Sequence, residues 1–206
     1  MTRTGACARG NLPVVGRVAE RSHLSGAEYL AWERLQPVRH EFFHGEVFAM
    51  AGGSLRHNAL SASVTAALYG AMRGRGCVVL SSDQRVGMDA GDRYVYPDVT
   101  VVCEAVVLVA GTSDVVANPT ILVEVLSSST EQYDRGLKWE GYQRLDALTD
   151  YVLVSQSEPR IEHFRRDRDG SWIYRSARPG QRIILSAGVE LNVDEIFANV
   201  LALAGD

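Results

Sequence analysis

The sequence has little cysteine, almost no lysine and no long apolar run. Its three cysteines, Cys7, Cys77 and Cys103, are an odd number without metal-ligand spacing, so neither a disulfide scaffold nor a zinc ribbon is expected. Free thiols predict a reducing compartment, the cytoplasm. No apolar stretch reaches the roughly 18 residues of a membrane-spanning helix, so no contact with a membrane is expected.

The chain also lacks a basic excess, since 21 Lys and Arg face 25 Asp and Glu. This balance excludes a protein held on nucleic acid by bulk positive charge alone. It leaves room for an enzyme acting on DNA, because a carboxylate-rich metal site is negative until a cation fills it. With 206 residues and 46% hydrophobic residues, we expect a loose tail over 1–20 and one domain over 21–206.

Lysine occurs once, at Lys138, against 20 arginines. Arginine is always charged and forked, whereas lysine is a compact donor whose pKa can be tuned. The single lysine therefore indicates either a site that needs a compact ammonium or chance survival on an ordinary helix.

The first half predicts alternating helices and strands. Ser25 and Glu28 form a capping box for a short helix, and Glu41–Met50 reads as a hairpin around a His-Gly turn. Helical spacing of apolar residues predicts a helix over His57–Arg73. Two strands are expected next, Cys77–Met88 and Tyr94–Cys103.

The second half predicts a buried strand, a helix and a meander. Thr120–Ser127 is almost continuously apolar, and a helix is expected over Glu131–Leu145. The meander strands are expected at 151–155, 160–166, 171–175 and 182–185, with a closing helix over Val193–Leu203. The expected fold is a mixed α/β domain with an antiparallel C-terminal portion.

Two carboxylates stand in unusual places. Glu124 lies at the centre of an apolar strand, where an isolated carboxylate must be paired, protonated or bound to metal; a structural salt bridge to an arginine is the alternative. Asp98 follows Pro97, which marks a strand edge, bulge or start. Together they offer hard oxygen ligands for Mg²⁺ or Mn²⁺, with the backbone carbonyl of Val125 as a third.

Lys138 lies on the helix that follows the Glu124 strand. Asp134, Lys138 and Tyr142 are spaced i, i+4, i+8, so they share one helix face. A surface ion pair of Asp134 with Lys138 would explain the spacing without any function. A lysine that orients water beside a metal would instead suit phosphodiester hydrolysis.

Weaker candidates surround this set. Glu41 is either a further acid at the metal or a solvated strand end, and Glu46 is interpreted as structural. His57 is either a phosphate or catalytic group or a helix-capping residue. Four arginines are candidates for gripping phosphate: Arg73, Arg75, Arg85 and Arg93.

Taken together, the order Pro97-Asp98, Glu124-Val-Leu-Ser, Asp134, Lys138 and Tyr142 resembles the Uma-two family, within the PD-(D/E)XK nuclease superfamily. The resemblance runs from about Leu24 to Phe197. Its other segments are Tyr29–Trp32, Glu41 with Gly45-Glu46, His57, Asp150–Val154 and Val193–Phe197.

The resemblance implies a restriction-endonuclease-like core, a mixed sheet flanked by helices, with Asp98 and Glu124 as metal ligands. The usual superfamily pattern has a lysine two residues after the acid, where this chain has Leu126. The resemblance implies that Lys138 supplies that function from the next helix.

The expected function is therefore a Mg²⁺- or Mn²⁺-dependent DNA endonuclease. Asp98 and Glu124 would hold the metal, Lys138 would position water, Glu41 would be an accessory acid, and His57 and Tyr142 would support them. A homodimer is expected because duplex DNA has two strands. Three alternatives stay open: a catalytically silent nucleic-acid-binding module, an interaction protein, and a hydrolase of small phosphoesters.

Overall fold

The computed structural model describes residues 20–203 and begins with the predicted capped helix. The backbone N–H of Ser25 donates to the Glu28 carboxylate at 2.8 Å, and the Ser25 hydroxyl accepts from the Glu28 N–H, which caps α1 (Gly26–Glu33). The predicted hairpin is confirmed as β1 (His40–Phe43) and β2 (Glu46–Ala49). His44 and Gly45 form its turn with φ of 46° and 92°, as tight hairpin turns require.

The two long strands expected next are each broken into two. The four pieces are β3 (Cys77–Ser81), β4 (Arg85–Met88), β5 (Arg93–Val95) and β6 (Val99–Cys103). A turn at 82–84 ends β3, and Pro97, which has no N–H to donate, separates β5 from β6. The pieces of each expected strand belong to different sheets, so Asp98 stands where the chain passes from one sheet to the other.

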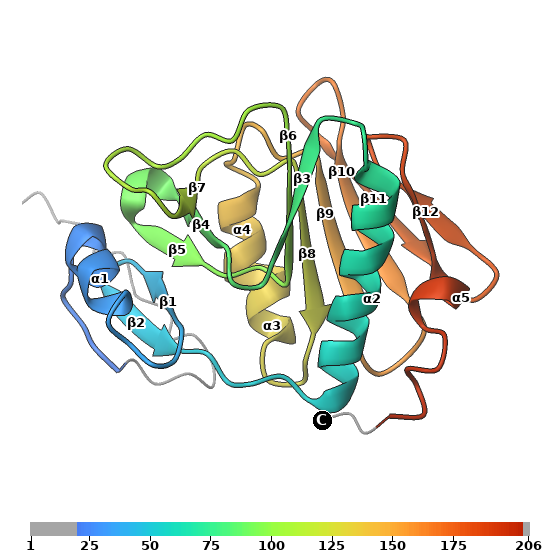
Figure 1. Cartoon of the computed structure of the whole chain (residues 1–206), viewed down its shortest axis with the longest axis horizontal. Coiled ribbons are helices and arrows are strands. Elements are labelled where there is room, and N and C mark those ends of the chain that lie inside the picture. The colour runs from blue at the N-terminus through green and yellow to red at the C-terminus, as the bar shows by residue number, and fades with distance from the viewer. Residues whose placement is uncertain (1–19, 204–206) are drawn as a thin grey trace, which may run out of the picture.

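Within residues 20–203, the strands form three sheets (Figure 1). The six-stranded sheet has the order β11-β10-β9-β8-β6-β3, in which β8 (Ile121–Leu126) and β9 (Asp150–Ser155) are parallel. The predicted meander is confirmed for β9, β10 (Ile161–Arg166) and β11 (Trp172–Ala177). The five-stranded sheet has the order β2-β1-β5-β4-β7, with β7 at Val115–Val116.

The strand expected at 182–185 does not continue the meander. It is β12 (Arg182–Ile184), which pairs with β13 (Glu190–Asn192) in a separate two-stranded sheet. The closing helix is also shorter than expected: α5 covers Val193–Ile196, capped by the Asn192 side chain.

The expected helix over 131–145 is present but irregular. It consists of α3 (Glu131–Tyr133), one π-helical turn η2 (Asp134–Lys138) and α4 (Trp139–Tyr142). The earlier helix α2 (Leu55–Met72) is regular and is capped by Ser54, and a single 3₁₀ turn η1 (Asp89–Gly91) joins β4 to β5.

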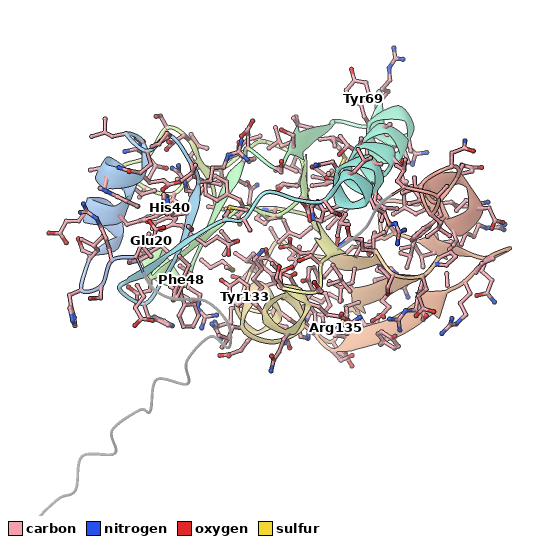
Figure 2. The ribbon with its side chains drawn as sticks, turned by 90° about the horizontal axis from the view of Figure 1, so that it is seen from below. Glu20, His40, Phe48, Tyr69, Tyr133 and Arg135 are labelled. Carbon is pink, nitrogen blue, oxygen red and sulfur yellow. A yellow bond between two sulfur atoms is a disulfide. The ribbon has the colours of Figure 1, made fainter. Side chains whose placement is uncertain are left out.

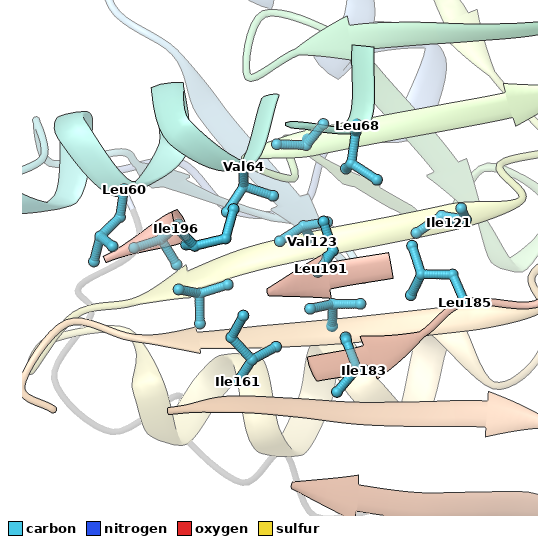
Figure 3. Packing of buried hydrophobic residues seen from close by; sticks show 14 of the residues in the cluster. Leu60, Val64, Leu68, Ile121, Val123, Ile161, Ile183, Leu185, Leu191 and Ile196 are labelled. Carbon is cyan, nitrogen blue, oxygen red and sulfur yellow. The ribbon is translucent and has the colours of Figure 1, made fainter. Parts of the chain in front are cut away.

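Helices cover both faces of the six-stranded sheet (Figure 1). Side chains alternate along β8, so Ile121, Val123 and Val125 pack on the α2 side, as Figure 3 shows for two of them. Leu122 and Leu126 pack on the opposite side with Tyr142 of α4. Glu124 lies on the same face of β8 as Leu122 and Leu126. It therefore faces the helical segment that contains α4 and not α2.

The expectation of free thiols is wrong for two of the three cysteines. β3 and β6 pair with Cys77 directly opposite Cys103, and the two form a disulfide across adjacent strands. Cys7 lies outside the described residues. The disulfide removes the thiol argument for a reducing compartment. Within residues 20–203, no helix is long and apolar enough to cross a membrane.

The disulfide predicts a measurable loss of stability on its removal. The two cysteines are 26 residues apart, and a cross-link closing a loop of that size contributes roughly 3 kcal/mol by restricting the unfolded chain. Replacing Cys77 and Cys103 together with serine should lower the free energy of unfolding in urea by that amount. The Cys7→Ser variant serves as the control, and equal stability of all three proteins would contradict the pairing.

Candidate functional site

Lys138 is the centre of a buried cluster of charges. Its ammonium lies 3.0 Å from Glu124 Oε1, 3.0 Å from Glu41 Oε1 and 3.3 Å from Asp134 Oδ1. All four side chains are buried. The expected alternative of a surface Asp134–Lys138 pair is therefore wrong, and so is that of Glu41 as a solvated strand end.

The cluster joins three parts of the chain. Glu41 comes from β1 of the five-stranded sheet, Glu124 from β8 of the six-stranded sheet, and Asp134 and Lys138 from η2. π-helical turns occur frequently at functional sites. Position 126 shares a face with Glu124, and Lys138 approaches that same face from the helix above it. Lys138 on η2 thus contacts the Glu124 carboxylate on the same face of the sheet as residue 126, where the usual superfamily pattern has its lysine.

Tyr142 holds the same carboxylate oxygen from the next turn. Its hydroxyl donates to Glu124 Oε1 at 2.7 Å, and its side chain is fully buried. Lys138 and Tyr142 thus both bind Oε1, which fixes the orientation of the Glu124 carboxylate.

Asp98 is held beside Glu124 by the neighbouring strand. Its Oδ2 accepts a hydrogen bond of 2.7 Å from the backbone N–H of Val125. His57, in the first turn of α2, points its Nε2 at the same oxygen from 3.4 Å. His57 therefore lies at the site, as one reading of the sequence expected. The helix cap of α2 is Ser54 and not His57.

Glu41, His57, Asp98, Glu124, Asp134 and Lys138 border one cavity of about 160 Å³, whereas Tyr142 lies behind Glu124 and outside its lining. Two loops that the sequence analysis did not assign to the site complete its wall: Met50–Gly53 before α2, and Ser127–Thr130 after β8. Ser127–Thr130 come directly after β8. Their position directly after the Glu124 strand was the available signal.

Burial and charge act strongly on the ionisable groups of the cluster. Burial raises the pKa of Glu124 well above its usual value; Lys138 opposes this, while Asp134 and Asp98 add to it. Burial likewise raises the pKa of Asp134. For Lys138, burial is the largest effect and would lower the pKa, but the carboxylates of Glu124, Glu41 and Asp134 together raise it well above the usual value. Lys138 is therefore protonated at neutral pH.

The excess of acids fits a hard divalent cation. Four carboxylic acids, Glu41, Asp98, Glu124 and Asp134, line a cavity that contains one ammonium. Within residues 20–203, no three His, Cys, Asp or Glu side chains are placed to share a metal ion. Carboxylate oxygens are the donors that hard divalent cations take in proteins. Asp98 and Glu124, the two acids that the sequence predicts as metal ligands, both border the cavity. Val125 also borders it.

Of the arginines considered for phosphate, Arg85 and Arg93 are buried. Arg85 donates to the Tyr96 hydroxyl and to Asp114, and Arg93 pairs with Asp89. Arg73 and Arg75 are exposed beyond the end of α2. Glu46 is half-buried on β2, outside the residues that border the cavity.

The fold has a counterpart among solved structures. The structure superposes on that of a putative nuclease belonging to DUF820 from Anabaena variabilis, with a TM-score of 0.69, 14% identity, and coverage of 86% of this chain and 99% of that one. The expected mixed α/β architecture is thereby confirmed as a nuclease-like fold.

Sequence comparison then gives the family. The Uma2 model, described as putative restriction endonuclease, matches residues 27–201, and the chain belongs to that family. It is 35% identical to the uncharacterized protein slr1290 of Synechocystis over 84% of this chain and 91% of that protein. It is 32% identical to the uncharacterized protein sll1609 of the same organism over 76% and 88%. The family expected from the sequence is confirmed.

Removing the central ammonium should destabilise the protein strongly. In Lys138→Met, three buried carboxylic acids lose their common partner, and breaking a buried ion pair in this way costs about 3–5 kcal/mol. Adding Glu124→Gln should recover part of the loss, which urea unfolding of both variants measures. A loss within about 0.5 kcal/mol, as for a surface site, would contradict the burial of the cluster.

The raised pKa of Glu124 predicts a stability that depends on pH. Its pKa is higher folded than unfolded, so its stabilising effect is complete below the unfolded pKa and is lost as the pH rises through the folded pKa. Glu124→Gln, measured in EDTA, should therefore gain stability relative to the wild type as the pH rises above the ordinary glutamate pKa of 4.5. Each unit of pKa shift corresponds to about 1.4 kcal/mol. A difference that is constant with pH would refute the shift.

Proposed function

We propose that this protein is a metal-dependent endonuclease that hydrolyses phosphodiester bonds in DNA. The observation that carries the proposal is the placement of Asp98 and Glu124 on neighbouring segments, with the protonated Lys138 bound to Glu124. The family and the nuclease-like fold support the same reaction class.

In this proposal Asp98 and Glu124 hold Mg²⁺ or Mn²⁺. When bound, the ion stabilises negative charge on the scissile phosphate and lowers the pKa of the attacking water. The backbone N–H of Val125 fixes Asp98, and Tyr142 fixes Glu124, so both carboxylates are oriented before substrate arrives. Preorganised groups of this kind do not have to be rearranged during the reaction.

The protonation state of Lys138 limits its role. A protonated ammonium donates hydrogen bonds to water or to a phosphate oxygen but cannot remove a proton from either. Lys138 therefore positions the nucleophile and offsets the charge that develops, and a different base receives the proton. His57, 3.4 Å from Asp98 and at the border of the cavity, is the group proposed to receive it.

In this proposal Glu41 keeps the Lys138 side chain in position. It contacts Lys138 from the opposite sheet, and the backbone N–H of Tyr96, two residues before Asp98, donates to its carboxylate at 3.4 Å. Glu41 thereby links the position of the lysine to that of the Asp98 segment. The interaction-protein alternative required Glu124 to pair with an arginine, whereas its hydrogen-bond partners are Lys138 and Tyr142.

The test is cleavage of supercoiled plasmid in Mg²⁺, Mn²⁺ or EDTA. Wild-type protein should nick or linearise the DNA with either ion and leave it intact in EDTA. Asp98→Asn and Glu124→Gln should each reduce the rate by roughly 10²–10³-fold, because each removes a charged ligand. Lys138→Arg should lower it by about tenfold or more, since a forked guanidinium does not replace a compact ammonium.

Glu162→Gln is the matched control. Glu162 is also a buried strand glutamate, but it pairs with Arg135 and Arg160 away from the cavity. This variant should cleave at the wild-type rate once its folding is verified by circular dichroism. Cleavage that survives in Asp98→Asn and Glu124→Gln would place the activity elsewhere, and absence of cleavage in the wild type would favour a silent DNA-binding protein.

A further inference from the structure

Three cavities meet at Asp98. Besides the cavity of about 160 Å³ that contains Lys138, Asp98 borders one of about 510 Å³ and another of about 560 Å³. The first and second also share His57, and the second and third share Asn58, Ser61 and Ser82. The three together form a groove that leads outward from the proposed metal site.

The outer part of this groove follows α2. Its wall is formed by α2 residues spaced three or four apart, which therefore lie on one face of the helix. They are Asn58, Ser61, Ala62, Thr65, Ala66 and Tyr69. The opposite wall is Ser81 and Ser82 at the end of β3. Leu60, Val64 and Leu68, on the other face of α2, pack into the core (Figure 3). The core is therefore covered by that face of α2 and not by the face that lines the groove.

Tyr69 stands at the far end of the groove and is 61% exposed. Figure 2 shows it projecting from α2 away from the body of the protein. The other aromatic residue exposed to a similar extent, Tyr174, packs its ring against Phe164. Within residues 20–203, no aromatic ring stacks on Tyr69 and no cation lies over it, and the exposed part of its ring is available to a ligand.

One arginine borders the middle cavity, and a second follows Tyr69 along the chain. Arg39 borders the middle cavity, where it pairs with Asp83 and remains 43% exposed. Arg73 follows Tyr69 by one helical turn and is exposed. The groove therefore combines the proposed acidic metal site at one end, small and polar walls with Arg39 in the middle, and an exposed aromatic ring at the outer end.

We infer that this groove binds an unpaired stretch of the substrate strand, with Tyr69 stacked on one of its bases. This inference rests on the proposed function. In a duplex the faces of each base are covered by its neighbours, so an aromatic ring can stack only on a base that has left the helix. A charged groove with an aromatic platform is the arrangement by which proteins bind single strands without reading sequence.

The test compares the binding of a fluorescent single-stranded oligothymidine with that of a duplex of the same length. Dissociation constants are measured in EDTA and again with Ca²⁺ for wild type, Tyr69→Ala and Tyr69→Phe. Tyr69→Ala should weaken single-strand binding by roughly 5- to 100-fold and duplex binding much less, whereas Tyr69→Phe should retain most of the affinity. Tyr174→Ala, at an exposed tyrosine away from the groove, is the matched control and should bind as the wild type does.

Photo-crosslinking supplies a readout that does not depend on affinity. A strand containing 5-iodouracil should crosslink to Tyr69 in the wild type, and the peptide that carries residues 58–73 should hold the adduct. Equal single-strand affinity of wild type and Tyr69→Ala, or an adduct elsewhere, would overturn the inference while plasmid cleavage stays intact. If the wild type neither binds nor cleaves DNA of either form, the proposed function fails, and the inference fails with it.

Discussion

The ammonium of Lys138 is the point on which the arrangement of this protein depends. It contacts carboxylates from β1, β8 and η2, and thereby joins the five-stranded sheet, the six-stranded sheet and the helix between them. Buried ion pairs contribute little net stability, because desolvation offsets much of the attraction. A cluster with more acids than cations is still harder to justify by stability, and the divalent cation that we propose would supply the missing positive charge.

The two proposed metal ligands are each oriented by hydrogen bonds from neighbouring groups. Lys138 and Tyr142 bind one oxygen of Glu124, and the Val125 N–H binds one oxygen of Asp98. Each carboxylate is held through one oxygen, so Asp98 and Glu124 would be oriented to hold the proposed metal ion. Asp98 also borders the groove along α2, so the proposed chemistry and the proposed path of the strand meet at one residue.

Local patterns in the sequence predicted much of this structure. The capping box, the His-Gly hairpin and the run around Glu124 depend on neighbours within a few residues, and each was found where expected. The alternation of β8 and the helical spacing of Lys138 and Tyr142 then brought three candidate residues together. These inferences needed only the periods of strand and helix.

Other features depend on pairing between distant segments. Pro97 marks one break locally, but the division of 77–88 and 94–103 between two sheets follows from which strands pair. The disulfide follows from the register of β3 on β6, and the burial of Glu41 follows from the approach of one sheet to the other. The irregular turn η2 lies inside a segment whose spacing fits a regular helix equally well.

The most direct test of the central claim is the stoichiometry of Mn²⁺ binding, measured by electron paramagnetic resonance of the free ion. Wild-type protein and Glu162→Gln should each bind one ion per chain, and Asp98→Asn and Glu124→Gln should each lose that site while they remain folded. Wild-type binding in both of these variants would contradict the assignment of Asp98 and Glu124 as the metal ligands.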